Sequence, residues 1–135
     1  MASEATSPAT TWVGIVDDDL SIRRALARAF RAHGIVARTF SSAEEYLSRT
    51  PDDEPSCLVL DARLGRMNGF ELQGRLCANG SPPPIIFIAA MDEIPSSLLA
   101  RMPGLHGFLR KPFETDALVA LVREYSATVA YDGAR

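Results

Sequence analysis

The chain has 135 residues, of which 47% are hydrophobic and 23% are charged, and this composition indicates one folded domain rather than a disordered or fibrous protein. The net charge of −3 offers no basic surface for a phosphate backbone, so we predict no direct nucleic-acid binding. No apolar run approaches the roughly 20 residues that cross a bilayer, and residues 1–10 lack a signal-peptide pattern. We therefore expect a cytoplasmic protein without membrane contact.

The first predicted elements are a strand, a helix and a second strand. Residues 12–16 form an apolar run that is closed by three consecutive aspartates, which is typical of a buried strand. An apolar stripe at helical spacing follows it and predicts a helix that ends near Gly34. A second apolar run at residues 35–40 predicts the next strand.

The segment "SSAEEYL" begins the second predicted helix. Its spacing fits a capping box formed by Ser41 with Glu44 or by Ser42 with Glu45. An acidic, turn-rich loop then leads to the strand "CLVLD" at residues 57–61, which again ends in an aspartate.

The second half of the chain repeats the alternation of helix and strand. A third helix is predicted to stop at Asn79 and Gly80, and the apolar run 85–90 follows as a strand. Pro95 and Pro103 leave room for only a short helix. Residues 107–109 form the last predicted strand, and an amphipathic helix follows it.

Five apolar strands alternating with five helices predict an α/β fold in which helices cover both faces of a parallel sheet. We expect a disordered tail at residues 1–10, one domain at residues 11–126 and a C-terminal tail at residues 127–135. The two cysteines, Cys57 and Cys77, are expected to be buried, reduced thiols rather than a disulfide or a metal pair.

Charged residues follow three of the predicted strands. In a parallel sheet the carboxyl ends of the strands share one edge, so Asp17, Asp18, Asp61 and Lys111 should converge there. Clustered carboxylates require raised pKa values or a bound cation, and oxygen ligands without histidine or cysteine favour Mg²⁺. A cation and a lysine beside carboxylates suit a phosphoryl group. We expect Asp19 to cap the first helix rather than to bind metal.

Three segments, "IVDDD", "LVLDARLGRMNG" and "GFLRKPF", resemble the receiver domain of two-component response regulators. The similarity runs from about Val13 to about Tyr125. It implies a (βα)5 flavodoxin-like three-layer sandwich with strand order 2-1-3-4-5. It also implies a sensor histidine kinase or phosphotransfer protein as phosphodonor and a downstream effector protein or domain, and homodimers are common in the family. Such a domain signals and is not an enzyme in its own right.

The resemblance also implies roles for individual residues. Asp61 would be the phosphoacceptor, and Asp17 and Asp18 would bind Mg²⁺ together with Asp61 and the backbone carbonyl of Arg63. Lys111 would pair with the phosphoryl group, as a catalytic partner of Asp61. The peptide bond before Pro112 would be cis, as in relatives.

The chain departs from the family pattern at a switch position. Ala89 stands where the family has a Thr or Ser whose hydroxyl bonds the phosphoryl group, and Phe108 stands at the aromatic switch position. We therefore expect phosphorylation of Asp61 with weak or unusual coupling to the surface formed by residues 95–103, the last strand and the last helix.

Two other functions fit parts of the sequence. A degenerate receiver could act as a constitutive protein-binding module, with Ala89 as the mark of lost switching. A haloacid-dehalogenase-type phosphatase is the remote alternative, because Asp17, Asp19 and Ser21 fit its D-x-D-x-[ST] motif, although Ala89 and the short chain count against it.

Overall fold

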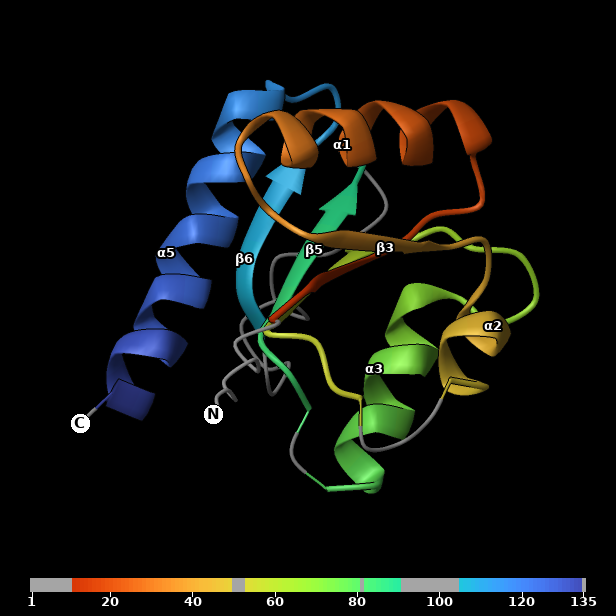
Figure 1. The fold of residues 1–135 in the computed structure, drawn as a ribbon. Coiled ribbons are helices and arrows are strands. Elements are labelled where there is room, and N and C mark those ends of the chain that lie inside the picture. The colour runs from red at the N-terminus through yellow and green to blue at the C-terminus, as the bar shows by residue number, and fades with distance from the viewer. Residues whose placement is uncertain (1–10, 50–52, 81, 91–104, 135) are drawn as a thin grey trace.

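Three strands that are buried at every residue form the centre of a five-stranded parallel sheet, which has the order β3-β2-β4-β5-β6 (Figure 1). The computed structural model describes residues 11–49, 53–80, 82–90 and 105–134. The strands are β2 Val13–Val16, β3 Ala37–Phe40, β4 Cys57–Asp61, β5 Ile85–Ala89 and β6 Leu105–Arg110. This order is the predicted order 2-1-3-4-5, counted over these strands along the chain.

The helices cover the two faces of the sheet in pairs (Figure 1). They are α1 Leu20–Ala32, α2 Ala43–Leu47, α3 Gly69–Ala78 and α5 Thr115–Ala134. Phe30 of α1 and Leu118 of α5 lie in one apolar core, and Tyr46 of α2 and Leu72 of α3 lie in the other. The predicted three-layer α/β sandwich is therefore confirmed, while the short helix expected between residues 95 and 103 lies outside the described residues.

Helix ends follow the predicted capping chemistry. The Asp19 side chain accepts hydrogen bonds from the amides of Ser21 and Ile22, so Asp19 is the N-cap of α1, as expected. Ser42 caps α2 through the amide of Glu45, which settles the choice left open by the sequence. Glu45 then accepts from the amide and hydroxyl of Ser41 rather than closing a box on Ser42.

Helix α5 continues to Ala134, through the residues expected to form a C-terminal tail. The domain boundary expected at residue 126 stays a prediction. Residues 113–132 contain neither proline nor glycine, so no helix-breaking residue interrupts this stretch before Gly133. The tail expected at residues 1–10 lies outside the described residues.

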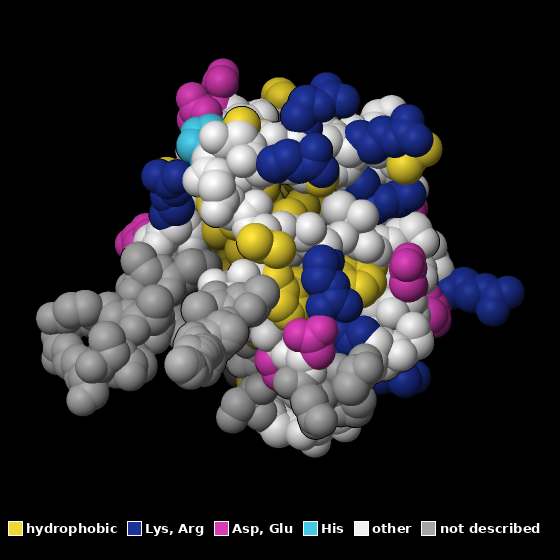
Figure 2. Space-filling model, viewed as in Figure 1, with side chains coloured by type: hydrophobic (Ala, Val, Ile, Leu, Met, Phe, Trp, Pro, Cys, Tyr) yellow, Lys and Arg dark blue, Asp and Glu magenta, His cyan; other side chains and the backbone are white. Residues whose placement is uncertain are grey.

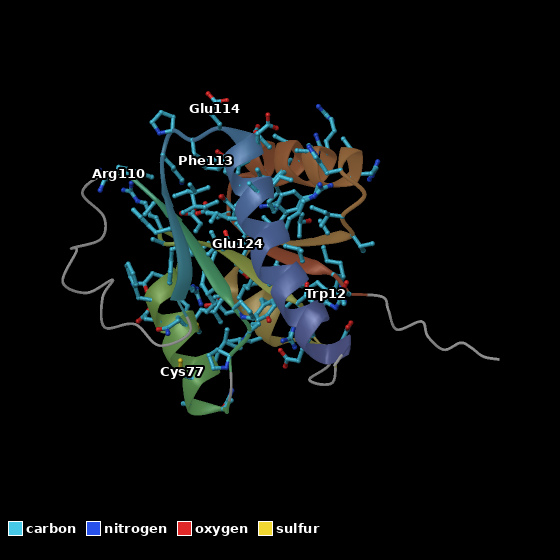
Figure 3. The ribbon with its side chains drawn as sticks, turned by 90° about the vertical axis from the view of Figure 1, so that its left-hand side faces the viewer. Trp12, Cys77, Arg110, Phe113, Glu114 and Glu124 are labelled. Carbon is cyan, nitrogen blue, oxygen red and sulfur yellow. The ribbon has the colours of Figure 1, made fainter. Side chains whose placement is uncertain are left out.

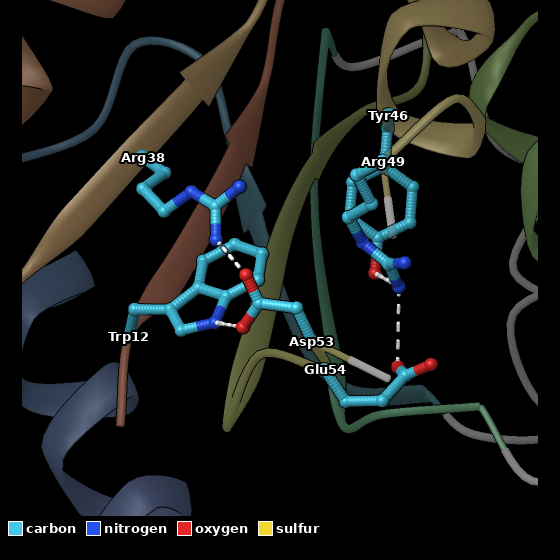
Figure 4. A network of polar contacts seen from close by, with 6 residues as sticks. All are labelled: Trp12, Arg38, Tyr46, Arg49, Asp53 and Glu54. Atoms are coloured by element: carbon cyan, nitrogen blue, oxygen red, sulfur yellow. Dashed lines mark hydrogen bonds and ion pairs between the residues drawn. The ribbon is translucent and has the colours of Figure 1, made fainter. Parts of the chain in front are cut away.

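Polar contacts fasten the acidic loop to the amino edge of the sheet, opposite the charged strand ends (Figure 4). Trp12 donates from its indole nitrogen to Asp53 over 2.8 Å, and Arg38 forms an ion pair with the same carboxylate. The Arg38 guanidinium also lies 4.1 Å from the centroid of the Trp12 ring. The hydrogen bond from Arg38 lowers the pKa of Asp53. A second pair joins Arg49 to Glu54 over 3.2 Å.

The outer face of α1 is basic. Arg24, Arg28 and Arg31 are exposed there, and Lys and Arg side chains gather over this helix in Figure 2. The inner face contributes Leu26 and Phe30 to the core. The helix therefore has the amphipathic pattern that the sequence predicted, with a strongly charged solvent side.

Gly69 should be required at the start of α3, because a Cβ there would lie 2.5 Å from the Asp61 carbonyl oxygen. We expect Gly69→Ala to lower the free energy of unfolding by about 1–3 kcal/mol, measured by urea denaturation. Gly74 is the matched control, since a Cβ there meets nothing within 4 Å. Gly74→Ala should stabilise by about 1 kcal/mol through helix propensity. A Gly69→Ala variant as stable as the wild type would contradict this packing argument.

Candidate functional site

Three aspartates meet at the carboxyl edge of the sheet. Asp17 and Asp18 follow β2, and Asp61 is the last residue of the neighbouring strand β4. Asp17 and Asp61 are only 2% and 3% exposed, whereas Asp18 is exposed. One carboxylate oxygen from each of the three lies within 4.8 Å of the others. The residues predicted to converge therefore do so.

Lys111 supplies the positive charge of this cluster. It follows β6, and its backbone amide donates to the Ala89 carbonyl at the end of β5 over 2.8 Å. Its ammonium lies 3.4 Å from Oδ1 of Asp61. The peptide bond between Lys111 and Pro112 is cis. Figure 3 shows Arg110 and Phe113, which flank this segment, at the end of the molecule away from Trp12.

Burial is the main influence on the two inner carboxyls. It raises the pKa of Asp17 to about 6, opposed by the hydrogen bond from the Asp19 amide and assisted by the charge of Asp61. Burial also raises the pKa of Asp61, opposed by the Arg63 amide and by Lys111. Desolvation therefore exceeds the relief from these donors, and the cluster favours a proton or a cation.

The donor set suits a hard cation. The three carboxylates offer oxygen ligands only, which Mg²⁺ prefers, and among the described residues no histidine or cysteine joins this cluster. Arg63 is exposed on the loop after Asp61, and its amide donates to Oδ1 of Asp61 over 3.1 Å. The role expected for the Arg63 carbonyl stays a prediction.

Of the two switch positions, Ala89 lies on β5, which pairs with the strand of Asp61, and Phe108 lies on β6, the next strand beyond β5. Ala89 is fully buried at the end of β5. Because its side chain is a methyl group, no hydroxyl is available there. Phe108 of β6 is half-buried and packs against the core that contains Leu60 and Ala89. The guanidinium of Arg110 lies 6.0 Å from the centroid of the Phe108 ring. The aromatic ring therefore has Arg110 beside it and no hydroxyl at position 89.

Two supports of the site were missed by the sequence analysis. Gly69 allows α3 to begin against the Asp61 backbone, and its amide donates to the Ala62 carbonyl over 3.1 Å. Arg23 donates from its guanidinium to the Asp17 carbonyl over 2.8 Å. A glycine at the expected start of a helix was a usable signal for the first. Nothing in the sequence distinguishes Arg23 from the other arginines of the same helix, so its contact with Asp17 could not be predicted.

An open parallel sheet with clustered carboxylates and a lysine at its carboxyl edge defines an α/β domain whose site lies at the strand ends. A family model described as "Response regulator receiver domain" matches residues 13–123. The chain therefore belongs to the response regulator receiver domain family, and it is a signalling domain.

Characterised relatives support this assignment. The chain is 40% identical to Nodulation protein W of Bradyrhizobium diazoefficiens over 95% of its own length and 60% of that protein. It is 36% identical to the response regulator protein TmoT of Ectopseudomonas mendocina over 81% of the chain and 50% of that protein. The chain thus spans between half and three fifths of these two relatives.

Solved structures agree in fold. The response regulator StyR has a TM-score of 0.80 at 38% identity, over 90% of this chain and 62% of that one. A receiver protein from Burkholderia phymatum has a TM-score of 0.74 at 37% identity, over 87% of this chain and 96% of that one. Among the described residues, no helix has both the length and the apolar character needed to span a bilayer.

The raised pKa of Asp17 predicts a pH dependence of stability in the absence of metal. The folded chain holds this proton up to about pH 6, whereas the ordinary value is 3.8. The folded state therefore binds more protons between these values, and the free energy of unfolding falls as the pH rises through them. Above about pH 6 the Asp17 carboxyl is ionised in the folded state as well, so the free energy of unfolding falls no further on its account. In EDTA, Asp17→Asn should stabilise the protein at about pH 7.5, on the order of 1 kcal/mol.

Urea denaturation in EDTA at about pH 5 and about pH 7.5 measures this effect. The wild type should be more stable at the lower pH, and Asp17→Asn should have a smaller difference between the two. Asp116→Asn is the control, because Asp116 is exposed on α5. An unchanged pH dependence in Asp17→Asn would contradict the assignment of the penalty to Asp17.

Proposed function

We propose that this receiver domain accepts a phosphoryl group on Asp61, with Mg²⁺, from a sensor histidine kinase or a phosphotransfer protein. The observation that carries the proposal is the convergence of three carboxylates within 4.8 Å, with the Lys111 ammonium 3.4 Å from Asp61. Three carboxylates are the number that one phosphoacceptor and two further metal ligands require. The family assignment supports the same chemistry.

The chain's own residues account for the transfer. An oxygen of the ionised Asp61 carboxylate attacks phosphorus, and the bond from phosphorus to the donor atom breaks as the new oxygen bond forms. Lys111 lowers the pKa of Asp61 against the larger effect of burial, and so favours the ionised form that the transfer requires. Mg²⁺, when bound, would neutralise the phosphoryl oxygens, and Asp17, Asp18 and Asp61 would hold it.

The phosphatase alternative is disfavoured by the position of Asp19. A site built on the D-x-D-x-[ST] motif would need the carboxyl of Asp19 free to join that of Asp17. The Asp19 carboxylate instead accepts hydrogen bonds from the amides of Ser21 and Ile22, at 2.8 and 3.3 Å. It is therefore occupied as a helix cap, outside the group of three convergent carboxylates.

A constitutive protein-binding module is the second candidate. The absence of a hydroxyl at the buried Ala89 favours it, because a domain that bound its partner in one state would not need that group. In either case we propose that a downstream effector protein or domain binds to the surface of this domain. The relatives FixJ and DctR are named as transcriptional regulatory proteins, and the chain spans 53% and 61% of them.

Phosphorylation is tested by incubation with Mg²⁺ and acetyl phosphate, followed by intact mass spectrometry. We expect an adduct of about 80 Da, the mass of one phosphoryl group, which hydroxylamine removes. Asp61→Asn should lack the adduct, and EDTA should prevent it. Asp116→Asn, an exposed change on α5, is the control. A wild type without adduct supports the binding module instead, and an adduct that maps to Asp17 contradicts the assigned nucleophile.

Atypical switching is tested at Ala89. Because the alanine has no hydroxyl, we expect beryllofluoride to change the environment of the Phe108 ring only weakly in the wild type. Ala89→Thr should enlarge the change, whereas Ala89→Val adds similar volume without the hydroxyl and should not. Fluorine NMR of fluorophenylalanine-labelled protein reads the ring directly. A full rearrangement of Phe108 in the wild type would refute this expectation.

A further inference from the structure

We propose that Arg23 is a positioning residue for the metal site, because its guanidinium holds the backbone turn that carries Asp17 and Asp18. The inference rests on the Mg²⁺ site of the proposed function. It concerns a residue outside the group of carboxylates, and Arg23 acts through the backbone rather than on the ion.

The Arg23 side chain extends toward the residues that precede α1. The backbone amide of Arg23 makes the ordinary helix bond to the Asp19 carbonyl over 3.0 Å. The side chain of Arg23 extends past the N-cap residue Asp19 and donates from Nη1 to the Asp17 carbonyl oxygen over 2.8 Å. A guanidinium donating to a carbonyl at this distance forms a strong, charge-assisted hydrogen bond.

The remaining bonds of the turn fix Asp17 but leave Asp18 free of direct support. The Asp17 amide donates to the Phe40 carbonyl over 3.1 Å, and the Asp17 carboxylate accepts from the Asp19 amide over 2.9 Å. Asp18 is exposed, and within the described part of the chain its carboxylate makes no hydrogen bond or ion pair. The orientation of its backbone therefore decides where this carboxylate points.

Arg23 controls that orientation through one peptide plane. The Asp17 carbonyl and the Asp18 amide belong to the same planar unit, so a bond that fixes the carbonyl also fixes the plane from which Asp18 projects. Loss of the bond frees this plane to rotate. The oxygens of Asp17 and Asp18 would then spend less time within reach of a common ion.

The target of the bond also matters electrostatically. Arg23 brings a permanent positive charge to the acidic turn, yet it bonds a carbonyl and so takes no carboxylate oxygen from the metal. Lys111 differs, because its ammonium lies against Oδ1 of Asp61. The structure therefore assigns charge compensation to both residues but backbone positioning to Arg23 alone.

Arg24 is a matched control on the next position of the same helix. Its side chain is exposed, and within the described residues its guanidinium makes no hydrogen bond or ion pair. Arg23→Gln and Arg24→Gln remove the same charge, but only the first removes the bond to the turn. By charge alone, either change should tighten the binding of a cation slightly.

The test is a calorimetric titration of the whole chain with Mg²⁺ at about pH 7.5, without phosphodonor. We expect Arg23→Gln to weaken Mg²⁺ binding about fivefold, the scale of one ordinary hydrogen bond lost. Arg24→Gln should change it less than about twofold, as a surface charge does. Arg23→Lys should recover part of the affinity, since its ammonium can also donate to a carbonyl.

A metal-free measurement separates positioning from general stability. In EDTA, hydrogen exchange at the amides of Asp18 and Asp19 should be faster in Arg23→Gln than in Arg24→Gln. The amides of the central strand β4, Cys57–Asp61, should be unchanged in both. Faster exchange confined to the turn supports the proposal, and faster exchange throughout the sheet overturns it in favour of a structural role.

The measurements distinguish a failure of the role of Arg23 from a failure of Asp61 as phosphoacceptor. Equal Mg²⁺ affinities for Arg23→Gln and Arg24→Gln overturn the positioning role while the phosphoacceptor proposal stands. A wild type that binds no Mg²⁺ overturns the metal site and, with it, both proposals. A wild type that binds Mg²⁺ and responds to Arg23→Gln, but takes no phosphoryl group on Asp61, supports the inference and refutes the transfer chemistry.

Discussion

The desolvation of two neighbouring carboxylates, Asp17 and Asp61, is the constraint on which the rest of the structure depends. Both are nearly inaccessible to water, and burial raises the pKa of each. Placing such groups side by side opposes folding unless a proton or a cation offsets their charge. A site of this kind persists because the hydrophobic sheet around it provides the stability that the carboxylates remove.

The sheet supplies this stability through strands that are buried on both faces. Every residue of β2, β4 and β5 is buried, and each face has its own apolar core. The parallel register places Val16 of β2 beside Leu60 of β4, so the aspartates that follow each position reach the same edge. The position of the acids is thus a consequence of strand pairing rather than of local loop structure.

Sequence patterns predicted the elements and the converging acids because these depend on local chemistry and on one rule of parallel sheets. Continuous apolar runs identified the strands, and Asp19 was recognisable as a cap from its place before a helical stripe. The supporting contacts were not predictable in the same way. Arg23 is one of several arginines on α1, and only the fold shows which of them turns back to the Asp17 carbonyl.

The same limit applies to the acidic loop. The sequence indicated only a turn-rich acidic connection, yet Asp53 binds Trp12 and Arg38 across the amino edge of the sheet. These three residues are far apart in the sequence, and their pairing requires β2 and β3 to be neighbours. The length of α5 was not predicted either, because the last residues of the chain were expected to fray and no residue in them marks where a terminal helix ends.

Ala89 has no side-chain hydroxyl, and the end of β5 is joined to the lysine segment by a backbone hydrogen bond. In the described residues, the end of β5 contacts the lysine segment through the bond from the Lys111 amide to the Ala89 carbonyl. Lys111 directly follows Arg110, whose guanidinium lies beside the Phe108 ring. Lys111 thus connects Asp61, through its ammonium, to the end of β6 that carries Arg110 and Phe108, and no hydroxyl at position 89 takes part in this connection.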